Sequence, residues 1–323
     1  MPTDSGTPLV SVIIPVYNAT HYIPEALNCL RAQTFRDFEV ILTNDGCPDT
    51  ENLEFALEPY WNEVRYLKSG QHASAAGSRN NAINASSAKY IALLDADDLW
   101  EPDYLKVHVE FLESHPEYDL VHSNAVMFGD TGWSGRIVVD PSVPASETTL
   151  HDVVLEKRLV YVAITARRES LLRAGLFDPE VWGGEDRDLW MRLMRIGGRL
   201  WYTGQLLCRY RFHLSNQGTH KLRSFHRHIA MFQKHLNLPG LTEEQAGWFE
   251  ESIRNVQAQI DLYEGKQALY HKERAKAIEL LKKANAVMHS GRITMAILGL
   301  QVAPGLLYSY VHRKFPTEYT YLH

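Results

Sequence analysis

Three carboxylates stand together at the end of an apolar run in the first third of the chain. The run Tyr90–Leu94 reads YIALL, and Asp95-Ala96-Asp97-Asp98 follow it directly. β-Favouring residues that end in acids are typical of a buried strand that brings polar groups to the edge of a sheet. Carboxylate oxygens suit Mg²⁺ or Mn²⁺, and these cations suit a diphosphate. The alternative is an Asp-rich turn without a ligand, because such turns often follow strands.

A second acidic cluster opens a predicted helix over residues 185–196. Glu185, Asp186 and Asp188 precede apolar residues at helical spacing. A carboxylate held at the start of a helix is a candidate general base. Three acids in one helical turn also interact favourably with the helix dipole, so a structural role is the alternative.

These acids need a scaffold, and the first half of the chain predicts one. Strand and helix signals alternate along it, at Val10–Val16, 21–32, 38–43, 51–60, 64–67, 73–85 and Tyr90–Leu94. Such alternation predicts an α/β fold, a mostly parallel sheet with helices on both faces and ligands at the carboxyl ends of its strands. Polar residues follow three of the strands at that edge: Tyr17-Asn18, Asn44-Asp45 and Asp95-Ala96-Asp97.

The second half of this region continues with mixed signals. We expect a helix over 102–115, a strand over 118–128, a loop over 129–146, an extended segment over 160–166 and a strand or hairpin over 199–212. No Gly/Ser-rich linker separates these parts. The sequence therefore predicts one catalytic domain over residues 1–220, followed by a helical region over residues 221–323.

The helical region carries two readable features. Thr242 and Gln245 form a Thr-x-x-Gln capping signal, and residues 263–288 suggest a helix pair with small residues. Further on, Ile293–Val311 is apolar, is flanked by basic residues, and is interrupted by Gln301, Pro304 and Gly305. A buried packing helix, an interfacial membrane anchor and a membrane span all remain open for this segment.

Composition narrows the class of protein. The chain has 323 residues, and its formal net charge of -6 gives no electrostatic case for binding nucleic acid. Its 3 cysteines are too few and too irregularly spaced for a disulfide framework or a zinc site. The first residues lack a basic segment followed by an apolar one. We therefore expect a cytoplasmic protein, with the inner face of the plasma membrane as a further possibility.

The order of the motifs resembles the family-2 glycosyltransferases, which have the GT-A fold. The resemblance covers about residues 9 to 215 and rests on seven segments: Val10–Asn18, Gln33-Thr34-Phe35, Phe38-Glu39-Val40, Asn44-Asp45-Gly46, Arg79-Asn80, Asp95-Ala96-Asp97-Asp98 and Gly184-Glu185-Asp186. It implies an inverting, metal-dependent transfer of a sugar from a nucleotide-sugar, most directly a UDP-sugar, to an acceptor hydroxyl.

The resemblance also assigns roles in the nucleotide site. Pro15 and Tyr17 would close the first strand against the base, and Asp45 would accept a hydrogen bond from uracil N3. Arg79 would lie near the nucleotide, beside a phosphate or the base pocket. For Asp45 a turn residue before a glycine is the alternative, and for Arg79 a solvated surface charge.

The acidic motif and a later stretch are implied to hold the diphosphate. Asp95 would bind the ribose beside Ala96, and Asp97 would ligate Mg²⁺ or Mn²⁺, while Asp98 would cap a helix or stabilise the loop. Arg211 and His213 lie in a Tyr-Arg-x-His stretch; His213 would donate to a phosphate or complete the metal shell, and a histidine that only caps a strand end is the alternative.

Asp186 is implied to be the catalytic base, with Glu185 and Asp188 as alternatives. Trp182, just before them, is a candidate for stacking on a sugar. The acceptor is expected to be a glycan, a glycolipid or another hydroxyl compound of cell-surface polysaccharide synthesis. Two other classes stay open: a sugar-phosphate nucleotidyltransferase, disfavoured because Pro15–Asn18 lacks a glycine-rich phosphate loop, and a non-catalytic binding module.

Overall fold

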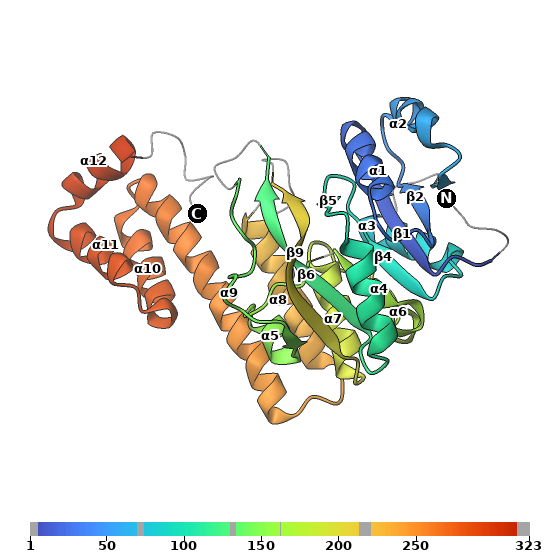
Figure 1. Cartoon of the computed structure of the whole chain (residues 1–323). Coiled ribbons are helices and arrows are strands. Elements are labelled where there is room, and N and C mark those ends of the chain that lie inside the picture. Colours follow the sequence, from blue (N-terminus) through green and yellow to red (C-terminus); the bar gives the residue numbers. More distant parts are fainter. Residues whose placement is uncertain (1–5, 70–73, 130–133, 162, 213–220, 315–323) are drawn as a thin grey trace. The chain divides into compact units, whose positions relative to one another are not determined.

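A nine-stranded sheet organises the first part of the computed structural model, which describes residues 6–69, 74–129, 134–161, 163–212 and 221–314. Contacts divide the chain into two units, Met1–Leu214 and Ser215–His323. The first unit contains the sheet, and the described part of the second is helical (Figure 1).

The sheet has the strand order β3-β2-β1-β4-β8-β6-β9-β5, with β7 also paired to β9. The strands are β1 Val10–Val16, β2 Phe38–Asn44, β3 Val64–Lys68, β4 Tyr90–Leu93, β5 Leu99–Trp100, β6 Leu120–Phe128, β7 Ser146–Thr148, β8 Ile164–Arg167 and β9 Leu200–Arg211.

Strands β1 to β4 are parallel, as the strand–helix alternation predicts. In the register, Val10 of β1 lies opposite Phe38 of β2 and Tyr90 of β4. The ends of these three strands are therefore neighbours, which brings the residues after them to one edge of the sheet.

The other half of the sheet is mixed. Strand β8 runs antiparallel between β4 and β6, and β6 pairs in parallel with β9. Residues 200–211 form one long strand rather than a hairpin. The two-residue β5 and three-residue β7 are too short to produce a readable sequence pattern.

Helices cover both faces of the sheet. The first unit contains α1 Ile23–Arg31, α2 Thr50–Leu57, α3 Ser74–Ala85, α4 Tyr104–Ser114, α5 Leu150–Val154, α6 Arg168–Arg173 and α7 Glu185–Arg195, with 3-10 turns at Thr20–Tyr22 and Glu58–Tyr60. Val12 and Ile14 of β1 share one core with residues of α1, α2 and α4. On the other face the Ser11 hydroxyl lies 2.7 Å from that of Ser86, just after α3. Alternation along the strand explains why successive residues meet different helices.

Part of the predicted loop over residues 129–146 folds back beside β6. Ile137 bridges Val126, and the Met127 amide donates to the Arg136 carbonyl oxygen at 2.7 Å. Residues 134–138 therefore lie in the predicted loop and pair with β6 through one isolated bridge.

The second unit contains α8 Lys221–Asn237, α9 Glu243–Tyr270, α10 Arg274–Met288, α11 Gly291–Val302 and α12 Pro304–Lys314. The predicted cap at Thr242 is confirmed: its hydroxyl accepts from the Gln245 amide at 3.1 Å, and the Gln245 side chain accepts from the Thr242 amide. Helices α9 and α10 pack closely at Gly265, where an added Cβ would lie 3.1 Å from Leu281.

The apolar segment Ile293–Val311 is not one helix. It breaks at Ala303 between α11 and α12, at the proline that interrupts the sequence pattern. Within the described ranges of the chain, no helix combines the length and hydrophobicity that a bilayer crossing requires.

Candidate active site

Half of the predicted site residues lie at or just after the carboxyl ends of β1, β2 and β4. Asp45 follows β2, is almost fully buried, and donates its amide to the Val16 carbonyl oxygen at 3.0 Å. Tyr17, which follows β1, keeps half of its side chain exposed, and Pro15 is half-buried. An exposed ring beside a buried carboxylate is an arrangement that can hold a planar base.

Asn44 fixes the turn that presents Asp45. Its side-chain amide donates to the Tyr66 hydroxyl at 2.7 Å and to Thr50 Oγ1 at 3.0 Å, and its side-chain oxygen accepts from the Cys47 amide at 2.8 Å. A carboxylate here could not donate the first two bonds. The amide at this position therefore holds the strand end and the turn together.

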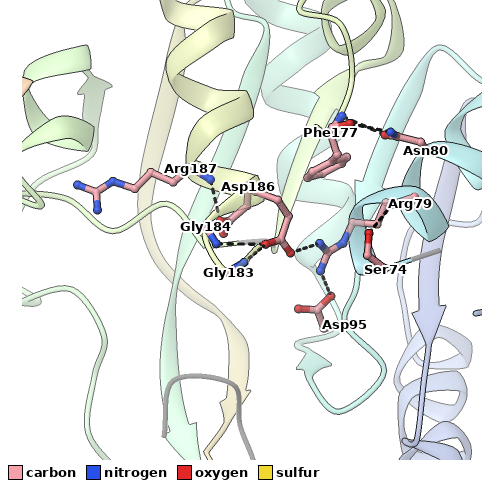
Figure 2. Close-up of polar contacts among 11 residues, drawn as sticks. Ser74, Arg79, Asn80, Asp95, Phe177, Gly183, Gly184, Asp186 and Arg187 are labelled. Carbon is pink, nitrogen blue, oxygen red and sulfur yellow. Dashed lines mark hydrogen bonds and ion pairs between the residues drawn. The ribbon is translucent and has the colours of Figure 1, made fainter. Parts of the chain in front are cut away.

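Arg79 of α3 joins the two acidic clusters (Figure 2). Its guanidinium lies 2.7 Å from Asp95 Oδ1 and 2.9 Å from Glu185 Oε1, and only 4% of the side chain is exposed. The two carboxylates raise the pKa of Arg79 against the opposing effect of burial. Arg79 is thus neither a solvated surface charge nor open to a phosphate in this structure.

The neighbouring residue Asn80 supports the same junction. Its side-chain amide donates to the Phe177 carbonyl oxygen at 2.7 Å, and its oxygen accepts from the Phe177 amide at 3.0 Å. The Phe177 ring lies 5.4 Å from the Arg79 guanidinium carbon (Figure 2). Two successive residues of α3 therefore position both the guanidinium and the chain that leads into α7.

Glu185 is held as a charged carboxylate at the start of α7. One oxygen accepts from Arg79, and the other accepts from the amides of Gly183 and Gly184, each at 3.1 Å. Both glycines have positive φ, 70° and 128°, which suits residues without a Cβ. Although burial acts in the opposite direction, Arg79 and these amides lower the pKa of Glu185.

Asp186 differs from both acids beside it. Its side chain is half-buried, and its carboxylate accepts from the Arg187 amide at 2.7 Å. Burial, followed by the charge of Glu185, raises the pKa of Asp186 to about 7. A carboxyl group with such a pKa can take up and release a proton near neutral pH.

Asp188 is fully buried and is engaged by an arginine of its own helix. It binds Arg192 at 2.8 Å, and Arg192 in turn donates to the carbonyl oxygens of Ala174 and Leu176. Asp188 thus stabilises, through Arg192, the turn that follows α6. Arg187 similarly donates to the Val153 carbonyl oxygen and anchors the end of α5.

The turn after β4 is tied to the last strand. The Asp98 amide donates to the Asp95 carbonyl oxygen at 3.0 Å, and the Asp98 carboxylate accepts from the Arg211 amide at 2.8 Å. Burial, with the charges of Asp97 and Asp95, raises the pKa of Asp98 well above its ordinary value. Asp98 therefore stabilises the loop, whereas α4 has Asp103 at its N-cap.

Asp97 is half-buried in this turn, beside buried Ala96. Its carboxylate provides hard oxygen donors of the kind that Mg²⁺ and Mn²⁺ bind. In the described part of the chain no three His, Cys, Asp or Glu side chains cluster as a metal site. The residues present fit a cation that takes one or two protein ligands and fills its shell with phosphate oxygens and water.

Arg211 contributes to this turn from β9. Its Nε donates to the Asp97 carbonyl oxygen at 2.7 Å, and its guanidinium pairs with Glu25 between the rings of Tyr22 and Phe128. His213 lies outside the described residues.

Sequence reasoning missed the partners of these arginines and of Glu185. Glu25, Phe177 and Gly183 carry no motif, and each acts on a residue distant in sequence or through its main chain. Trp182, with 46% of its side chain exposed, is placed just before the acidic helix start.

Comparisons with known proteins show which sequences and folds this chain is similar to. The model of glycosyl transferase family 2 matches residues 11–155. An uncharacterized glycosyltransferase of Rickettsia felis is 26% identical over 78% of this chain and 42% of its own length. A putative teichuronic acid biosynthesis glycosyltransferase of Bacillus subtilis, TuaG, is 26% identical over 63% of this chain and 79% of its own length. The chain spans less than half of the length of the first of these relatives.

Two solved structures share the fold. TarS 1-349 of S. aureus in complex with UDP-GlcNAc has a TM-score of 0.64 at 18% identity, covering 94% of this chain and 91% of that one. A mannosyltransferase of Pyrobaculum calidifontis in complex with GDP-Man and Mn2+ has a TM-score of 0.60 at 18% identity, covering 98% and 90%. The first unit thus has the GT-A architecture, and residues 11–155 within it are similar to the family-2 glycosyltransferases.

Proposed function

We propose that this protein transfers a sugar from a nucleotide-sugar, most directly a UDP-sugar, to an acceptor hydroxyl with inversion at the anomeric carbon. The observation that carries the proposal is the junction at Arg79. One buried guanidinium binds Asp95 of the candidate metal motif and Glu185, the residue before the candidate base. A donor-binding motif and a proton acceptor are therefore held in one cluster, which sugar transfer requires.

The donor assignment depends on Asp45 and Tyr17. A buried carboxylate accepts a hydrogen bond from uracil N3–H, and the half-exposed Tyr17 ring can lie against the base. The TarS structure contains UDP-GlcNAc, which supports a uridine nucleotide, while the mannosyltransferase contains GDP-Man. GDP-sugars should therefore be tested beside UDP-sugars as donors.

Asp97 is the proposed ligand of Mg²⁺ or Mn²⁺, with Asp95 and His213 as further candidates. When bound, the cation would supply positive charge to the departing nucleoside diphosphate. Asp95 is oriented by Arg79, and the Asp97 main chain is held by Arg211. These contacts fix the turn before any ligand arrives.

Asp186 is the proposed base. It accepts the proton of the acceptor hydroxyl as that oxygen forms a bond to C1 of the sugar. The bond from C1 to the diphosphate breaks on the opposite face, and its electron pair leaves with the diphosphate. Glu185 stays ionised through its bonds to Arg79 and the two glycine amides, and Asp188 is paired with Arg192, so neither offers the proton-accepting character of Asp186.

The acceptor is proposed to be a hydroxyl of a glycan or glycolipid in cell-surface polysaccharide synthesis, made on the cytoplasmic side. Similarity to TuaG, a putative teichuronic acid biosynthesis enzyme, supports this class. Catalysis is assigned to residues 1–220, and residues 221–323 are proposed as an accessory region.

The proposal is tested by offering UDP- and GDP-sugars with Mn²⁺ to the purified protein and measuring nucleoside diphosphate release with candidate acceptors. Nuclear magnetic resonance of the product reads the anomeric configuration. We expect acceptor-stimulated release and an inverted product. Retention would contradict the mechanism, pyrophosphate formation would indicate a nucleotidyltransferase, and no turnover of any donor would favour a non-catalytic binding module.

A further inference from the structure

Helices α11 and α12 use only one side to pack within the second unit. Ile293, Ile297, Leu300 and Val311 are buried in a core with Ala268, Leu269, Ala277 and Leu281 of α9 and α10. His312 also contacts the Tyr270 carbonyl oxygen at 2.9 Å. These contacts fix which face of each helix points inward.

The opposite side of the two helices is apolar and exposed. We call it the apolar stripe; it consists of Met295, Leu298, Val302, Leu306 and Tyr310, which are 68%, 46%, 83%, 76% and 55% exposed. Spacings of three and four residues place the members within each helix on one face. Other large apolar side chains are exposed among the described residues, but in the stripe several of them follow one another at helical spacing. Exposed large apolar side chains gathered on one helix face are typical of an interaction surface.

The segment that carries the stripe contains basic residues and no acidic ones. Residues 289–317 contain no Asp or Glu and three Lys or Arg residues, Arg292, Arg313 and Lys314, although the whole chain has a net charge of -6. Arg313 follows Leu306 and Tyr310 at helical spacing, and Lys314 lies 3.1 Å from the Tyr310 hydroxyl. Positive charge is therefore concentrated at the end of the stripe.

We propose that the apolar stripe docks the protein onto an anionic lipid surface. An apolar helix face with basic ends is the arrangement by which helices lie in the interface of a bilayer without crossing it. Tyrosine suits this boundary because its ring is apolar and its hydroxyl is polar. A second copy of the chain fits less well, because a symmetric contact would bring the basic residues Arg292, Arg313 and Lys314 of two copies together.

The inference does not depend on sugar transfer, so it is tested by binding alone. The full chain is floated with phosphatidylcholine vesicles that do or do not contain phosphatidylglycerol. We expect binding to the anionic vesicles and weaker binding at high salt. The variant Val302→Ser/Leu306→Ser should bind at least about tenfold less tightly, since two exposed apolar side chains are lost.

A matched control is Phe55→Ser, which removes a 72% exposed side chain from α2. It should bind vesicles like the unchanged protein, and all variants should have the same circular dichroism spectrum. Equal binding by the stripe variant and the unchanged protein would overturn the proposal. So would absence of vesicle binding, or an oligomer that the stripe variant alone dissociates.

Discussion

Arg211 donates a 2.7 Å hydrogen bond from its Nε to the carbonyl oxygen of Asp97, 114 residues earlier in the chain. Its own amide also donates to Asp98. The last strand of the sheet thus holds the turn that carries the candidate metal ligand. An arginine assigned to the diphosphate by family pattern is, in this structure, engaged in positioning that turn.

Replacing Arg211 should therefore affect the metal-dependent step. Arg211→Met removes the bond to Asp97 and the pair with Glu25, and we expect a loss of about 1–3 kcal/mol in unfolding free energy. Binding of UDP in the presence of Mn²⁺ should weaken with it. Arg209→Met is the control, because Arg209 is half-exposed and pairs with Glu101 at the surface. Equal effects of both variants on UDP binding would refute a positioning role for Arg211.

Asp186→Asn should lower kcat by about 10²–10⁴-fold and leave donor binding nearly unchanged, because only the proton acceptor is removed. Steady-state kinetics and calorimetric donor binding measure the two effects separately. Glu180→Gln, an exposed carboxylate six residues earlier, should behave like the unchanged protein. Normal turnover of Asp186→Asn would transfer the role of base to another group.

The pH dependence of turnover should report the same carboxyl group. Asp186 accepts a proton only when ionised, so kcat/KM should rise about tenfold per pH unit below its pKa and level off above it. The midpoint is expected near the raised pKa of about 7. Glu185→Gln removes the charge that raises this pKa, and the midpoint should move to lower pH. An unchanged or higher midpoint in that variant would contradict the assignment.

The ion pairs of Arg79 with Asp95 and Glu185 should contribute measurably to the free energy of unfolding. Arg79→Met leaves Glu185 and Asp95 without their shared partner, and breaking such a buried pair typically lowers the unfolding free energy by about 3–5 kcal/mol. Arg79→Met/Glu185→Met should recover part of that loss, because the uncompensated buried charge is gone. Urea denaturation of the single and double variants makes the comparison. If the double variant is less stable by the full sum of the two singles, the two residues are not coupled.

The sequence predicts the parallel strands well because their apolar runs are local signals. Val10–Val16 and Phe38–Asn44 lie almost where they are expected. The break between α11 and α12 is likewise marked by Pro304. Strand β8 differs: nothing local to residues 164–167 indicates that they run antiparallel between β4 and β6.

The candidate site shows the same contrast: local motifs can be read from the sequence, and contacts between distant residues cannot. Motif order locates Asp95, Asp97 and Asp186, but spacing alone cannot separate Asp186 from Asp188, since both lie in the first turn of α7. Their environments separate them: Asp188 meets Arg192 inside the protein, whereas Asp186 stays half-buried. The partners of Arg79 lie 16 and 106 residues away, a distance that no sequence pattern spans.

The most direct test of the account is calorimetric titration with UDP, with and without Mn²⁺, of the unchanged protein and of Asp97→Ala. We predict that UDP binds more tightly with Mn²⁺ than without it, that GDP, CDP and ADP bind less well, and that Asp97→Ala loses the Mn²⁺ dependence. Glu101→Gln, which removes a surface partner of Arg209, should keep it. Mn²⁺-dependent UDP binding by Asp97→Ala, or no nucleotide binding by the unchanged protein, would contradict the account.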